Sequence, residues 1–232
     1  MRLRILLAPV VASVALLAGC TLGGPGATPT PVSNGVQDEE ADQILARATQ
    51  ALSDAESVHV AGTIGEGMLG ATLNLTFVGE DVTGTANILG VLASVTRVGT
   101  DLYLKADTSL LEGFLPPDQQ GNLTFFDGKW LKIDASLVES LLPVPLTVAD
   151  LATATAPLTK GEVTTVGDTQ AITLTDADGA VLHVATVGEP YLLDITAEGD
   201  RSLTFSGFGD EVTIEPPPAD QVVDLLEELG LG

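Results

Sequence analysis

Histidines are the first residues to consider for chemistry, and the chain has only two of them. His59 and His183 each stand between apolar neighbours in segments that alternate apolar and polar residues. Alternation places such a residue on the outward face of a strand, so both histidines are predicted at the surface. No His-Glu-x-x-His motif favours a zinc hydrolase, and no Gly-x-Ser-x-Gly motif presents a serine nucleophile. We therefore predict no catalytic residue, no metal site, no cofactor and no enzyme activity.

One acidic stretch begins like a calcium-binding loop. It is Asp176-Ala177-Asp178-Gly179. In such a loop the fifth and twelfth residues bind the ion through side-chain oxygens. Here those positions hold Ala180 and Val187, which have no side-chain oxygen. The stretch is therefore predicted to be the turn of a β-hairpin.

The only cysteine, Cys20, follows a segment with the order of a secretory signal peptide. Arg2 and Arg4 precede an apolar run over 5–17, which is shorter than the roughly 20 residues of a membrane-spanning helix. The run ends in Leu-Ala-Gly-Cys, which resembles a bacterial lipobox. That resemblance implies a lipoprotein signal peptide over 1–19, cleavage before Cys20, a diacylglyceryl thioether on its sulfur and an added N-acyl chain such as palmitate. A free cysteine after an ordinary signal peptide is the alternative.

Two or more acyl chains hold a protein stably on a membrane. The lipid on Cys20 would therefore place the protein at the cell membrane, facing the periplasm or cell wall. The following segment, to residue 37, is rich in Gly and Pro and is predicted to be a flexible linker. A single folded domain is expected from 38 to 232.

The charge balance excludes one class of partner. The 232 residues include 32 Asp+Glu against 9 Lys+Arg, which gives a formal net charge of −23. Nucleic-acid binding needs a positive surface for the phosphate backbone, so no nucleic-acid partner is predicted. A single cysteine also excludes disulfides within the chain and cysteine-based zinc or iron–sulfur sites.

Periodicity predicts a helix followed by many strands. Acidic residues 38–40 begin an amphipathic helix, and from Ser57 the apolar period changes to two. Alternating segments are typical of half-buried strands joined in an antiparallel meander. They lie at 69–77, 82–88, 91–98, 102–106, 172–174, 182–184, 193–197 and 203–205.

Residues 108–158 have a different pattern. Short helices are predicted at 109–114, 136–142 and 147–152, with an isolated strand at 128–133. A C-terminal helix is predicted over 219–229, after three prolines. The expected fold is α+β: a strongly curved antiparallel sheet, a half-barrel of about ten strands, whose helices cover the concave face and enclose an apolar cavity.

The apolar face of these strands is the predicted ligand site. A cavity for acyl chains needs a wide apolar lining with few unpaired polar atoms. The same side chains could instead fill a solid core against the helices. The predicted lining residues are Leu73, Leu75, Phe77, Ile88, Leu102, Leu104, Leu131, Ile133, Leu193, Ile195, Leu203 and Phe205.

Several short motifs resemble a known family. The lipobox, the helix running into Ser57-Val58-His59-Val60, the stretch 98–104 and the closing stretches 190–195 and 203–214 are similar, in order, to the mycobacterial LppX/LprAFG lipoproteins. The resemblance implies a LolA/LolB-like half-barrel with a hydrophobic pocket. It also implies an acylated lipid or lipoglycan ligand, carried or presented across the actinobacterial envelope. An envelope transporter is a candidate partner. The family has no fixed catalytic residues.

Two functions remain open at this point. One is a lipid-anchored protein that holds an acylated lipid in its cavity. The other is a structural or interaction lipoprotein with a filled core, whose acidic surface engages another envelope protein.

Overall fold

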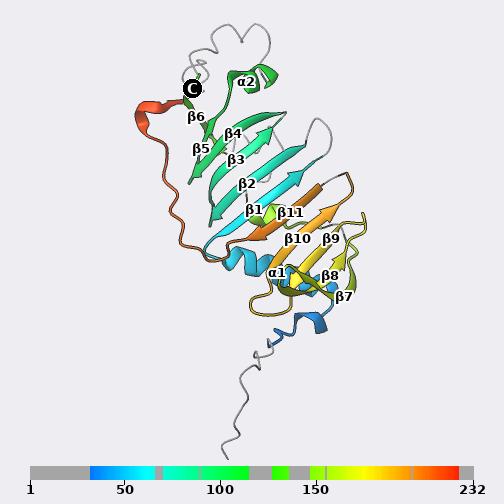
Figure 1. Ribbon diagram of the computed structural model, residues 1–232. Helices are drawn as coiled ribbons and strands as arrows, with labels where there is room; N and C mark the ends of the chain where they lie inside the picture. Colours follow the sequence, from blue (N-terminus) through cyan, green and yellow to red (C-terminus); the bar gives the residue numbers. More distant parts are fainter. Residues whose placement is uncertain are drawn as a thin grey trace, which may run out of the picture. The chain divides into compact units, whose positions relative to one another are not determined.

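The computed structural model describes residues 32–65, 70–88, 90–114, 127–135, 147–154, 156–199 and 201–224 (Figure 1). All of them belong to one compact unit, Val32–Gly232. The predicted signal peptide, Cys20 and most of the predicted linker lie outside the described residues. No helix in the described ranges is long and apolar enough to span a bilayer.

A single curved, unclosed sheet of twelve strands dominates the fold (Figure 1). Its order is β12-β6-β5-β4-β3-β2-β1-β11-β10-β9-β8-β7. Two antiparallel meanders, β1 to β6 and β7 to β11, meet where β1 pairs with β11. The strands are β1 Val58–Ile64, β2 Ala71–Val78, β3 Asp81–Ile88, β4 Val91–Val98, β5 Asp101–Lys105, β6 Trp130–Asp134, β7 Thr159–Val166, β8 Thr169–Thr175, β9 Val181–Ala185, β10 Leu192–Ala197, β11 Arg201–Ser206 and β12 Val222–Asp224.

This architecture confirms the α+β class and the curved antiparallel sheet. The expected count of about ten strands is too low, because β7 and β12 lie where no strand was predicted. Strand β7 escapes periodicity because it is an edge strand with both faces exposed, so its residues need not alternate.

Helix α1, Ala41–Asp54, packs on one face of the sheet. Glu40 and Gln43 form a capping box at its start, and Ile44, Ala48 and Leu52 form its buried stripe. Helix α4, Val148–Leu151, packs on the same face and begins at Thr147, whose hydroxyl oxygen accepts a hydrogen bond from the Asp150 N–H at 3.2 Å. Helix α2, Thr108–Phe114, confirms a third predicted helix, and the predicted helix at 136–142 lies outside the described residues.

We call the face of the sheet covered by α1 and α4 the inner face, and the opposite one the outer face. Val60, Leu75 and Phe205 are cross-strand neighbours on the inner face, and all three belong to the main core cluster. The alternate residues His59, Thr76 and Ser206 therefore share the outer face. Burial of one face and exposure of the other is the physical cause of the alternation seen in the sequence.

Two glycines sit within inner-face rows of the sheet. Gly62 of β1 and Gly84 of β3 have φ angles of +145° and +146°, which side-chain-bearing residues rarely adopt. A β-carbon on Gly62 would lie 2.0 Å from the Ser202 carbonyl oxygen, and one on Gly84 would lie 2.1 Å from that of Asn74. The neighbouring backbone thus approaches too closely for any side chain at these points.

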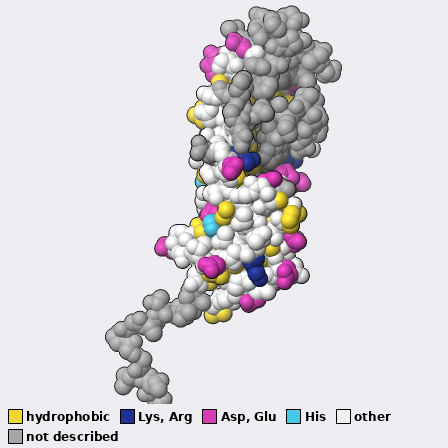
Figure 2. Space-filling view, turned by 90° about the vertical axis from the view of Figure 1, so that its right-hand side faces the viewer, with side chains coloured by type: hydrophobic (Ala, Val, Ile, Leu, Met, Phe, Trp, Pro, Cys, Tyr) yellow, Lys and Arg dark blue, Asp and Glu magenta, His cyan; other side chains and the backbone are white. Residues whose placement is uncertain are grey.

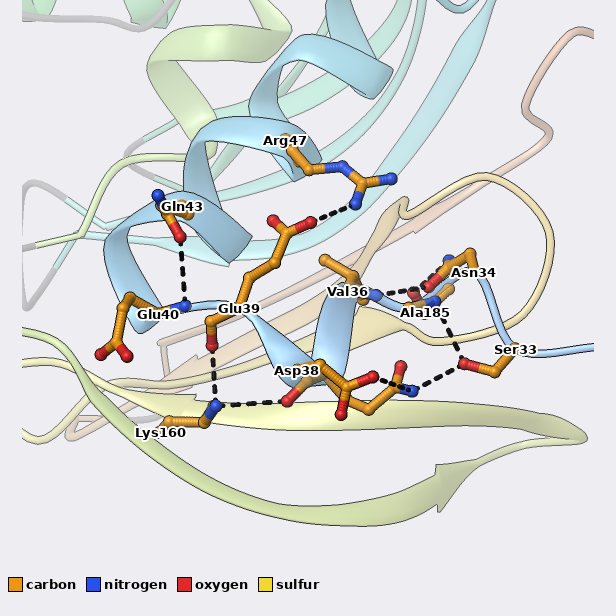
Figure 3. Close-up of polar contacts among 12 residues, drawn as sticks. Ser33, Asn34, Val36, Asp38, Glu39, Glu40, Gln43, Arg47, Lys160 and Ala185 are labelled. Atoms are coloured by element: carbon orange, nitrogen blue, oxygen red, sulfur yellow. Dashed lines mark hydrogen bonds and ion pairs between the residues drawn. The ribbon is translucent and has the colours of Figure 1, made fainter.

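The segment from residue 32 to 37 is part of the folded domain, which corrects the predicted linker boundary (Figure 3). Asn34 donates from its backbone N–H to the Thr186 carbonyl at 2.8 Å, and from its side chain to the Ala185 and Gly188 carbonyls, each at 3.0 Å. Val36 is fully buried. One apolar side chain and one well-placed amide therefore fix a segment whose composition alone is typical of a linker.

Two basic side chains contact the next segment, residues 37–39 (Figure 3). Lys160 of β7 donates to the carbonyls of Gln37 and Glu39 at 3.2 and 2.7 Å. Arg47 of α1 pairs with the Glu39 carboxylate at 2.6 Å. The point where the chain enters the domain is thus fastened to both a strand edge and a helix.

The predicted C-terminal helix over 219–229 is wrong for its described part. Residues Ala219–Gln221 form a short 3-10 turn, and Val222–Asp224 form β12, which pairs in parallel with β6. Two consecutive β-branched valines favour a strand, and β6 offers an unpaired edge. The rest of that prediction lies outside the described residues.

Candidate functional site

The predicted lining residues lie on the inner face, with one exception. Cross-strand pairs such as Leu73 with Gly62, and Leu104 with Leu131, align them in rows on the side that α1 and α4 cover. Leu193 lies at a β-bulge in β10 and is half-buried, whereas its neighbour Leu192 is fully buried and belongs to the core. The bulge shifts the alternation by one residue, which sequence periodicity cannot detect.

The inner face is packed rather than hollow where α1 covers it. Phe77 and Phe205 are each 2% exposed and lie in one cluster with Ile44 and Leu52 of α1. Leu102 belongs to a second, smaller cluster with Ala135 and Val95. Several core positions were not among the predicted lining residues: Val58, Val60, Val82, Ile172, Leu174, Leu182, Val184 and Leu192.

An open cavity of about 370 Å³ lies where α4 meets the ends of β1, β10 and β11. We call it the α4 pocket. Among its apolar lining residues, Leu151 and Leu203 are buried and belong to the main core cluster. Asp150 and Asp178 are exposed lining residues, so the pocket passes from an apolar inner end to a charged outer one. Its lining residues are Thr63, Ile64, Gly65, Asp150, Leu151, Thr153, Ala154, Asp176, Asp178, Ala180, Ile195, Ala197, Arg201, Ser202 and Leu203.

Polar side chains at the α4 pocket are held in place by local hydrogen bonds. The Asp176 carboxylate accepts from the N–H groups of Asp178 and Ala180 at 2.9 and 2.8 Å, which closes the β8–β9 hairpin. Arg201 donates to the Glu198 carbonyl at 3.0 Å. The predicted hairpin turn at 176–179 is thus confirmed, and no group of acidic, His or Cys side chains within the described ranges could hold a metal ion.

A second open cavity, of about 410 Å³, lies along α1. We call it the α1 groove. It is formed by Leu45, Ala46 and Thr49 of the helix, with further residues of α1, and by the segment after α4. Ala154 lines both cavities, so the two lie next to each other at this residue.

Both histidines lie on the outer face, as predicted, and both have hydrogen-bond partners. His183 Nδ1 lies 2.6 Å from an oxygen of Asp194 on the next strand. His59 lies between Ser206, 3.3 Å from its Nδ1, and Asn74, 3.1 Å from its Nε2. Sequence reasoning missed that a serine lies beside a histidine here, because the two are 147 positions apart.

Among the described residues, no further part of a hydrolytic site lies beside Ser206, His59 and Asn74. The three residues lie on the uncovered face of neighbouring strands whose backbones are paired with each other. Paired strands leave no N–H groups directed at an oxyanion, which acyl transfer requires. We therefore treat these contacts as cross-strand hydrogen bonds.

Comparisons with known proteins relate the chain to solved structures only. No known protein family and no curated protein matches the sequence. The crystal structure of LprF from Mycobacterium bovis matches with a TM-score of 0.51 and 14% identity, over 82% of this chain and 100% of that one. The lipoprotein LppX from Mycobacterium tuberculosis matches with a TM-score of 0.47 and 17% identity, over 76% of this chain and 100% of that one. The chain therefore shares the fold of LprF, which confirms the predicted resemblance at the level of fold.

Proposed function

We propose that the protein is an envelope lipoprotein, anchored through Cys20, that binds an acylated lipid or lipoglycan for transport or presentation. The α4 pocket carries this proposal. Its apolar end contains Leu203, which is buried, and Ile195, which is half-buried, two of the predicted lining residues. Its exposed end carries the carboxylates of Asp150 and Asp178. An apolar end joined to a polar opening suits an acyl chain joined to a polar head group.

The size of the pocket sets how a lipid would enter. Pockets for small molecules measure roughly 300–1,000 Å³, so about 370 Å³ is at the lower limit. A ligand with long chains therefore requires α4, or the segment after it, to move away from the sheet. Helix α4 is only four residues long, so its displacement breaks few backbone hydrogen bonds, although Val148 and Leu151 must leave the core. Each methylene buried would contribute about 0.8 kcal/mol.

A filled core is the competing arrangement, and one observation favours it. Phe77, Phe205 and the buried stripe of α1 form a packed cluster on the inner face. In that case the protein would be an interaction lipoprotein, and its acidic surface would engage an envelope protein such as a transporter (Figure 2). Whether the protein takes up lipid discriminates between the two.

Mass spectrometry of the full chain, purified from membranes of an actinobacterial host, tests the proposal. Organic extraction separates a bound lipid from acyl groups attached to Cys20. We expect about one multi-acylated lipid per protein. Ala180→Trp would fill the α4 pocket and is expected to reduce the recovered lipid at least about tenfold. Ala46→Trp, which changes only the α1 groove, is the matched control.

Two outcomes would contradict the proposal. One is a wild-type protein that is free of lipid and takes up no added lipid, which would support the interaction lipoprotein. The other is full lipid recovery from a folded Ala180→Trp variant, which would place the lipid outside the α4 pocket.

A further inference from the structure

The outer face carries an array of uncharged hydrogen-bonding side chains. On strands β11, β1, β2, β3 and β4 most of the outward residues align across the strands in three rows, and Val78, Asp81 and Val98 stand outside these rows at one end of β2, β3 and β4. Apart from His59, Ala61 and Leu92, every residue in these rows is Thr, Ser or Asn. The rows are Ser206, His59, Thr76, Thr83 and Thr96; Thr204, Ala61, Asn74, Thr85 and Ser94; and Ser202, Thr63, Thr72, Asn87 and Leu92.

No acidic or basic residue lies within these rows, although the chain has a formal net charge of −23. Asp81 lies at the end of the array, where its carboxylate accepts a hydrogen bond from the Gly99 N–H at 2.8 Å, and further charges lie on the strands at either side. On one side is the contact of His183 with Asp194, and on the other is the ion pair of Lys132 with Asp101 at 3.1 Å. Because soluble protein surfaces ordinarily mix charged residues among polar ones, a broad area without them calls for a physical reason.

Two of the rows are open to solvent. Thr72, Asn74 and Asn87 are exposed, as are Ser202 and Thr204. In the remaining row some hydrogen-bonding groups bond to each other: the hydroxyls of Thr83 and Thr96 lie 3.3 Å apart, and Thr96 is only 6% exposed. The hydrogen-bonding capacity of the outer face is therefore concentrated in the rows of Thr204 and Thr72.

The chemistry of the array selects its partner. Hydroxyl and amide groups both donate and accept hydrogen bonds, which matches a ligand made of hydroxyls. An anionic or cationic polymer would find no opposite charge in the array. A protein partner normally uses aromatic or Arg anchors, and the array has none; its one large exposed apolar side chain is Leu92, 64% exposed.

The geometry of the array is regular and stiff. Neighbouring groups are about 4.8 Å apart across strands and about 6.8 Å apart along a strand. The first spacing is comparable with the repeat of a sugar unit in an extended glycan. Threonine has few side-chain rotamers, so little freedom is lost when it is fixed by a ligand. We propose that the outer face binds a neutral polysaccharide.

Co-sedimentation of the full chain with insoluble polysaccharides tests this proposal. The probes are amorphous cellulose and cellulose phosphate, which share a backbone and differ in charge, and a neutral galactomannan can be tested by affinity electrophoresis. We expect binding to at least one neutral polysaccharide that is insensitive to added salt, and at least about tenfold weaker binding to cellulose phosphate.

Hydroxyl deletion locates the surface. The double variant Thr72→Val with Thr204→Val keeps side-chain shape and is expected to weaken binding at least about tenfold. The matched control is Thr159→Val with Thr165→Val on edge strand β7, which should bind like the wild type. Circular dichroism would verify that each variant is folded.

Three outcomes would overturn the proposal. The first is a wild-type protein that binds none of the neutral polysaccharides. The second is binding that the folded outer-face variant retains in full. The third is dimerisation through this face, seen by sedimentation velocity as a dimer that the outer-face variant abolishes while no polysaccharide is bound.

Discussion

The inner and outer faces of the sheet are made from the same strands, and successive residues along each strand alternate between the two faces. Phe205 on the inner face is 2% exposed, whereas the adjacent Thr204 on the outer face is exposed. The inner face presents apolar side chains to α1 and α4, and the outer face presents uncharged hydrogen-bonding groups to solvent. Charged residues are few on the central strands: Arg97 lies in an inner row, opposite Val82 and Leu102, and Asp81 lies at the start of β3 on the outer side. The strong acidity of the chain resides mainly in its loops, helices and border strands. One alternating pattern can therefore supply two distinct binding chemistries.

Substitution of adjacent residues gives the largest expected contrast between the faces. Phe205→Ala should lower the free energy of unfolding by about 3–5 kcal/mol, because it removes a buried ring and leaves a cavity. Thr204→Val should change it by no more than about 0.5 kcal/mol. Urea denaturation measures both. Similar losses from the two substitutions would refute the division into a packed and an open face.

A smaller effect is expected where the inner face has no side chain. Gly84→Ala should cost about 2–3 kcal/mol, because the methyl group meets the Asn74 carbonyl and the φ angle is unfavourable. Gly90→Ala is the control: its φ is +82°, but its methyl group would have no neighbour within 4 Å, so about 1 kcal/mol is expected. Equal losses in thermal or urea unfolding would show that backbone strain alone matters at Gly84.

The smallest effect concerns Tyr103 and Asp101 on β5, the strand next to the uncharged rows of the outer face. Burial raises the pKa of Tyr103 above its ordinary value of 10.0, and the nearby Asp101 carboxylate raises it further. The folded state therefore favours the neutral phenol. Its contribution to stability is complete below the unfolded pKa and is lost as pH rises through the folded one.

Tyr103→Phe should accordingly reduce the loss of stability as pH rises above about 10. The urea midpoint at each pH is the measurement, and Tyr191→Phe is the control that keeps Tyr103. If the Tyr103→Phe variant loses as much stability at alkaline pH as the wild type, the Tyr103 phenol does not contribute to that loss.

Sequence patterns predicted the strands well where one face is buried. Leu73, Leu75 and Phe77 alternate with polar residues, and they form the buried side of β2. The same reasoning failed at β7, which buries neither face, and at β12, whose pairing with β6 depends on a strand far away in the sequence. It also failed at Leu193, where a bulge changes the register.

The candidate sites were less predictable than the strands. Only Ile195 and Leu203 of the predicted lining residues reach the α4 pocket, which draws on several separate segments. Its opening depends on the Asp176 hairpin and on Thr147 at the start of α4, and no local pattern brings these together. The rows of the outer face likewise appear only when cross-strand register is known.

The pairing of β1 with β11 has a consequence for how the chain folds. His59 and Ser206, which face each other there, are 147 positions apart, whereas the other antiparallel strand pairs join nearer neighbours in the chain. Each meander can form from local contacts soon after its own strands are available. The middle of the sheet cannot close until residue 206 has emerged, and closing so long a loop is slow. Until then β1 presents an unpaired edge to the surroundings, so this interval is when the chain most needs protection from aggregation.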